Sequence, residues 1–123
     1  MFQAGLFPDF RGEDTLLLWG DSPGITDLQK GLKAVAAGLA MTFEFEGLPP
    51  LRIAQSEAAG GLSHVDRVDE NLVWTVSPSV LAEAAELLTE LQRVDAGHQY
   101  IDATGLADQI MIAKNEYPAT LRP

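Results

Sequence analysis

The chain has 123 residues, 46% of them hydrophobic, which suffices for one domain with a single core and is too apolar for a disordered chain. It contains no cysteine, which excludes disulfides, thiol nucleophiles and cysteine-ligated metals. Eighteen acidic and eight basic residues give a formal net charge of −10. This charge disfavours binding to nucleic acid and to anionic membranes.

The first 14 residues contain Phe2, Leu6, Phe7 and Phe10 among glycine, proline and aspartate. They lack the basic start and long apolar run of a signal peptide, and no apolar run in the chain approaches the roughly 20 residues of a membrane span. We therefore expect a cytoplasmic protein. We expect this stretch to be an arm packed over the sheet or over a second subunit, the alternative being an apolar patch for another partner.

Two parts of the chain resemble each other. The segment "LLLWGDSPGI" (16–25) is similar to "NLVWTVSPSV" (71–80), and aligning their tryptophans gives an offset of 55 residues. Further on, "RIAQSE" (52–57) resembles "MIAKNE" (111–116) at an offset of 59. Two matched blocks in the same order predict an internal duplication. At the first offset the matched pairs include Trp19 with Trp74, Ser22 with Ser77 and Pro23 with Pro78.

Each block begins with a short apolar run, "TLLLW" or "NLVWTV", that is typical of a buried strand. The Ser-Pro pair that follows predicts a serine N-cap and a proline in the first helical position. Apolar residues then recur every three or four positions, which predicts an amphipathic helix. The predicted buried faces are Ile25, Leu28, Leu32 and Val35 in the first helix and Val80, Leu81, Ala84, Leu87, Leu88 and Leu91 in the second.

Two strand candidates follow each helix: "MTFEFE" and "LRIAQSE" around "GLPP", then "HQYIDA" and "DQIMIAK" around "TGLA". We expect Pro49 and Pro50 to mark the first hairpin turn and Gly105 the second. The predicted fold is therefore one α+β domain (1–123) with pseudo-twofold symmetry, about six strands and two helices packed on the sheet. It comprises a βαββ repeat at 15–57, a joint at 58–70 and a second βαββ repeat at 71–117.

Candidate metal ligands are densest in "HVDRVDE" (64–70), which offers one imidazole and several carboxylates. Alternating charges are also typical of a solvated linker, and we favour that interpretation, with no metal site. The candidate ligands of this segment are His64, Asp66, Asp69 and Glu70.

Two further arrangements offer acid/base chemistry. His98 has Asp102 four residues further on, as a base oriented by a carboxylate would, although a half-buried structural histidine is the simpler interpretation. Glu57 and Glu116 end equivalent strands, so a twofold axis could bring the two carboxylates together, or both could face water. Trp19 and Trp74 could line a shared pocket, but burial alone explains them.

No nucleophile elbow, phosphate-binding loop or dinucleotide fingerprint occurs in the sequence. We therefore favour a non-enzymatic protein without a cofactor, namely an inhibitor or toxin-neutralising, immunity-type protein that contacts a basic protein partner. The alternative is a small-molecule- or metal-binding domain, or a small enzyme, with His64, His98, Glu57 and Glu116 at the interface of the two repeats. A homodimer that pairs sheet edges is compatible with both.

The acidic residues predicted to meet the basic partner fall in three stretches of the sequence, where they would favour rapid, salt-sensitive association with a cationic surface. They are Glu44, Glu46, Asp66, Asp69, Glu70, Glu83, Glu86 and Glu90.

Overall fold

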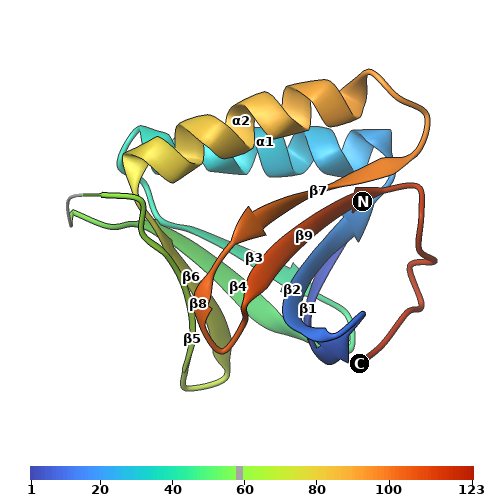
Figure 1. Ribbon diagram of the computed structural model, residues 1–123, viewed down its shortest axis with the longest axis horizontal. Helices are drawn as coiled ribbons and strands as arrows, with labels where there is room; N and C mark the ends of the chain where they lie inside the picture. Colours follow the sequence, from blue (N-terminus) through green and yellow to red (C-terminus); the bar gives the residue numbers. More distant parts are fainter. Residues whose placement is uncertain (58–59) are drawn as a thin grey trace.

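The chain folds into two helices packed on two mixed sheets, one of four strands and one of five (Figure 1). This confirms the predicted α+β class. The computed structural model describes residues 1–57 and 60–123. The elements are β1 (Phe2–Phe10), β2 (Glu13–Gly20), α1 (Ser22–Ala36), β3 (Met41–Phe45), β4 (Leu48–Gln55), β5 (Ser63–Val68), β6 (Asn71–Val76), α2 (Pro78–Gln92), β7 (Gly97–Asp102), β8 (Thr104–Gly105) and β9 (Gln109–Lys114).

Each sheet combines strands from both halves of the chain. The four-stranded sheet has the order β1-β2-β9-β7, and the five-stranded sheet has the order β3-β4-β6-β5-β8. In both sheets the strands that join the halves are parallel, β2 with β9 and β4 with β6. Neither sheet can therefore form from one half of the chain alone.

The described residues contain nine strands rather than the predicted six, because three segments expected to lie outside the strands form β1, β5 and β8. The short β8 lies in the predicted turn around Gly105 and pairs parallel with β5. The N-terminal stretch forms β1, which pairs antiparallel with β2, and is not an arm over the sheet. In the predicted joint, residues 63–68 form β5, which pairs with β6. Residues 58 and 59 of that joint lie outside the described part of the chain.

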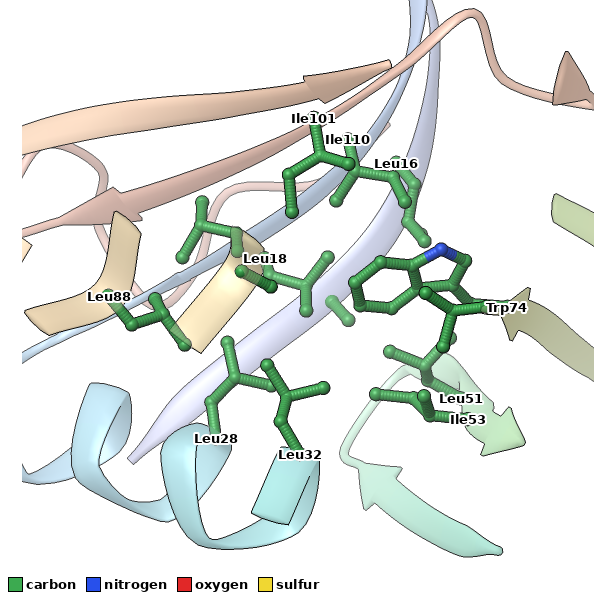
Figure 2. Close-up of a cluster of buried hydrophobic side chains, with 14 of the residues drawn as sticks. Leu16, Leu18, Leu28, Leu32, Leu51, Ile53, Trp74, Leu88, Ile101 and Ile110 are labelled. Carbon is green, nitrogen blue, oxygen red and sulfur yellow. The ribbon is translucent and has the colours of Figure 1, made fainter. Parts of the chain in front are cut away.

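The main core lies between the two helices and the two sheets. Trp74 of β6 is fully buried there, and Figure 2 shows its indole beside leucine and isoleucine side chains from the helices and the sheets. Its Nε1–H donates a hydrogen bond of 2.9 Å to Ser63 Oγ on β5. The residues that contribute to this core with it include Leu16, Leu18, Leu28, Leu32, Leu51, Ile53, Leu88, Ile101 and Ile110.

The helices lie side by side and bury corresponding positions (Figure 1). These buried positions differ by 56 residues, whereas aligning the two tryptophans in the sequence gives an offset of 55. Because a shift of one residue moves a strand side chain to the opposite face, Leu18 and not Trp19 occupies the position of Trp74. The pairs of buried helix residues are Gly24 with Val80, Ile25 with Leu81, Leu28 with Ala84, Leu32 with Leu88 and Val35 with Leu91.

The helix starts explain this shift. The N-cap of α1 is Asp21, whose Oδ1 accepts a hydrogen bond of 2.8 Å from Gly24 N–H, and the predicted cap Ser22 lies inside the helix. The hydrogen bond from the Met1 ammonium and then that from Gly24 lower the pKa of Asp21. Ser77 is the N-cap residue of α2, as predicted, but its hydroxyl contacts Ser79 Oγ and makes no capping bond.

The first hairpin after α1 also turns earlier than predicted. Residues 46 and 47 form the turn between β3 and β4, and Gly47 has a φ of 74° that favours glycine. Pro49 and Pro50 lie inside β4 instead. None of the helices in the described part of the chain is long and apolar enough to cross a membrane.

Candidate functional site

The structure brings two of the predicted ligand residues together on the four-stranded sheet. His98 Nδ1, on β7, lies 2.7 Å from Glu116 Oε1, which follows β9. The antiparallel pairing of β7 with β9 creates this contact, and it gives His98 a carboxylate partner other than the predicted Asp102. The His98 ring also packs edge-on against Tyr100, with 5.1 Å between ring centroids. A carboxylate beside Nδ1 orients an imidazole and directs Nε2 away from the carboxylate.

The other two ligand candidates lie apart from this pair, in or beside the five-stranded sheet. His64 Nδ1, on β5, lies 2.9 Å from Thr104 Oγ1 on β8. Glu57 follows β4 and is exposed, and the carboxylate of Glu116 contacts His98 rather than Glu57. Within residues 1–57 and 60–123, no group of three or more histidine and acidic side chains could hold a metal ion.

A second apolar cluster covers the face of the four-stranded sheet that is turned away from the helices. Trp19 is buried in it, and its Nε1–H donates a hydrogen bond of 2.9 Å to the Pro118 carbonyl. Tyr117 and Leu121 of the C-terminal segment (115–123) pack on the cluster from outside. The two tryptophans thus lie on different sheets and in different clusters, and they do not line a shared pocket.

Burial of Tyr117 has an energetic consequence. Its hydroxyl is buried and has no hydrogen-bond partner among the described residues. Burial is also the main cause of its raised pKa, to which the charges of Glu116 and Tyr100 contribute, against an opposing effect of Arg11. A buried hydroxyl without a partner destabilises the folded state by about 1–3 kcal/mol.

We therefore expect Tyr117→Phe to raise the free energy of unfolding at neutral pH by about 1 kcal/mol, measured by urea denaturation. Because the folded state raises the pKa of Tyr117 above its ordinary 10.0, the unfolded chain loses this proton first, and the free energy of unfolding falls as the pH rises above 10. The variant should lack this component of the alkaline loss. Tyr100→Phe, at an exposed tyrosine, is the control: it should leave the free energy of unfolding at neutral pH unchanged and only slightly reduce the alkaline loss, because it removes a charge that helps to raise the pKa of Tyr117. Destabilisation by Tyr117→Phe would contradict the expectation.

The acidic residues predicted to meet a partner are all exposed, but they lie in three separate regions. Glu44 and Glu46 are on or beside the edge strand β3. Asp66, Asp69 and Glu70 lie at the hairpin that joins β5 to β6, toward the opposite edge of the same sheet. The three glutamates of α2, Glu83, Glu86 and Glu90, lie on the helical layer.

The α2 glutamates recur at i, i+3 and i+7, so they form one stripe along the helix. Glu86 and Glu90 line a shallow surface hollow together with Ala85 and Leu87. Glu90 makes an exposed ion pair of 3.0 Å with Arg93, a type of pair that contributes little to stability. The hollow thus combines two carboxylates with aliphatic surface, which suits a lysine or arginine side chain.

A different cleft, of about 270 Å³, lies between α1 and α2. Leu32 of α1 and Leu81 of α2 are among the apolar residues that line it. Small residues in its lining, Ala36 and Ala85 among them, leave the space open. Lys33 is the single charged side chain among the described residues that line this cleft.

Comparisons of the chain with protein-family models, with curated proteins and with solved structures found no match.

Proposed function

We propose that the protein is a small acidic binding protein that occupies a basic protein partner, as an inhibitor or an immunity-type protein does. The observation that carries the proposal is the hollow on α2, where Glu86 and Glu90 face one surface depression. Two carboxylates beside aliphatic surface can bind the charged end and the apolar stem of an arginine or lysine together.

The net charge of −10 supports the same proposal. A strongly acidic protein attracts cationic proteins over long distances, which accelerates their association and makes it salt-dependent. The acids near β3 and those of the β5–β6 hairpin would contribute to this long-range attraction. The α2 stripe would supply the direct contacts.

The test compares two variants with the same change in charge. Glu86→Gln/Glu90→Gln removes two charges from the hollow, and Glu44→Gln/Glu46→Gln removes two from the β3 region. Basic proteins would be captured from a lysate of the source organism on the immobilised wild-type chain, eluted with salt and identified by mass spectrometry. The dissociation constant of each purified partner would then be measured for all three chains.

We expect the α2 variant to bind the partner about tenfold more weakly than the wild type, and the β3 variant to bind it within about twofold, since a tenfold change is about 1.4 kcal/mol. Equal losses in both variants would mean that only the net charge matters and that α2 is not the contact surface. Failure to capture any basic protein would contradict the proposed function itself.

We also propose that the chain arose by duplication of a smaller unit, is cytoplasmic and forms a homodimer through its sheet edges. The matching buried positions of α1 and α2 support the duplication. The absence of cysteine is consistent with a reducing compartment.

The strands β1 and β7 end the four-stranded sheet and offer unpaired backbone groups to a second copy. Analytical ultracentrifugation would test the dimer.

A further inference from the structure

We propose that the cleft between α1 and α2 binds a small amphipathic monocarboxylate, with its hydrocarbon part against the leucines and its carboxylate at Lys33. The proposal is independent of the basic partner, because the cleft and the hollow of Glu86 and Glu90 are lined by different residues, apart from Ala85 and Thr89.

The shape and lining of the cleft point to a small molecule with an apolar body. Its volume of about 270 Å³ is close to the lower end of ligand pockets, and its walls are mainly hydrocarbon. Leu32 and Leu81, each 3% exposed, form part of the floor, and their side chains already pack in the main core. A hydrocarbon chain placed in the cleft would cover apolar surface on both helices.

The charge of the lining identifies the head group of the ligand. The chain has 18 acidic residues and 8 basic ones, yet the one charged side chain among the described residues of this cleft is a lysine. No ion pair or hydrogen bond of the described residues engages the Lys33 ammonium. The neutral polar side chains at the cleft, Gln29, Gln55 and Thr89, can also donate hydrogen bonds to a carboxylate. The local charge therefore favours an anion, although the protein as a whole is acidic.

A free carboxylate fits better than the head group of a membrane lipid. The net charge of −10 repels the many negative charges of an anionic bilayer, whereas the repulsion of a single monovalent carboxylate is much weaker. The cleft also lies between two helices of 15 residues each, and its volume of about 270 Å³ limits the occupant to a short chain.

The test uses three probes with the same eight-carbon chain: octanoate, octan-1-ol and octylammonium. Each would be titrated into the ¹⁵N-labelled full chain while amide chemical shifts are followed by NMR. Octanoate should shift the amides that surround the cleft on both helices, with a dissociation constant on the order of 1 mM. Octylammonium should bind there at least about fivefold more weakly.

Two variants and one control locate the site. Lys33→Gln should weaken octanoate binding about fivefold and leave octan-1-ol binding unchanged, because it removes only the charge. Ala85→Leu should abolish binding of all three probes by filling the cleft, and leucine is compatible with the helix. Lys30→Gln, one turn away and outside the cleft lining, should bind octanoate like the wild type.

The proposal is wrong if octanoate does not bind, if it shifts amides elsewhere, or if octylammonium binds the cleft as tightly. It is also wrong if a captured basic partner shifts the cleft amides and octanoate does not, since the cleft would then belong to the protein interface. The Glu86→Gln/Glu90→Gln variant should bind the basic partner more weakly and still bind octanoate like the wild type. The two proposals can therefore fail separately.

Discussion

Replacing Trp74 with alanine should lower the free energy of unfolding by about 3–5 kcal/mol, as measured by urea denaturation. Trp74 is fully buried in the core between the helices and the two sheets (Figure 2), so its removal leaves a cavity lined by both layers. Parallel pairing of β6 with β4 places Trp74 opposite Ile53, which limits how far the neighbours can move into the space. The loss is a large fraction of the stability of a domain of this size.

Two milder variants keep this prediction testable if the alanine variant does not fold. Trp74→Phe retains an aromatic ring but loses the N–H, and should cost less than Trp74→Ala. Ser63→Ala keeps the tryptophan but removes the acceptor of its 2.9 Å hydrogen bond, which should cost about 1–3 kcal/mol. A loss below about 1 kcal/mol in Trp74→Phe and in Ser63→Ala alike would contradict the importance of this buried group.

The sequence predicts the helices well, because their signal is local. A repeat of apolar residues every three or four positions needs no knowledge of the partner surface. The predicted faces of both helices are buried, with Leu87 only partly so. The strands that follow each helix are also found, although Pro49 and Pro50 lie in β4 and not in the turn.

The sequence does not predict β1, β5 or β8. Of these, β1 and β5 form hairpins with the strands that directly follow them, β2 and β6. β1 contains Gly5 and Pro8, and apolar side chains on both of its faces pack in different clusters, so the alternating pattern of a strand is absent. β5 ends in charged, exposed residues and resembles a linker, yet Val65 is fully buried against the core. Each is a strand because it pairs with the neighbouring β2 or β6, a pairing that the side-chain pattern of β1 and of β5 does not signal.

The candidate site is likewise predictable only in part from the sequence. His98 and Glu116 both stand out in the sequence, but local spacing pairs His98 with Asp102. Their contact follows from the register of β7 and β9, in which His98 lies opposite Ala113. The cleft beside Lys33 has no sequence signal of its own, because it arises where small residues of two helices meet.

Gly31→Ala should lower the free energy of unfolding by about 1–3 kcal/mol, although alanine is normally about 1 kcal/mol better than glycine inside a helix. Gly31 is buried in α1, and a methyl group there would overlap the tip of the Phe43 ring on β3. That ring cannot easily move, because it packs edge-on against Phe2 with 5.0 Å between the centroids.

The double variant Gly31→Ala/Phe43→Leu tests this cause, since leucine is shorter than phenylalanine and vacates the position of the overlapping ring atoms. The two substitutions should therefore be non-additive in urea denaturation, with the double variant at least about 1 kcal/mol more stable than the sum of the single losses predicts. Additive losses would show that the Phe43 ring is not the cause, and a Gly31→Ala variant as stable as the wild type would show that β3 shifts to admit the methyl group. The close packing of β3 on α1 depends on the missing side chain at position 31, which is the reason that an amphipathic helix carries a glycine on its buried face.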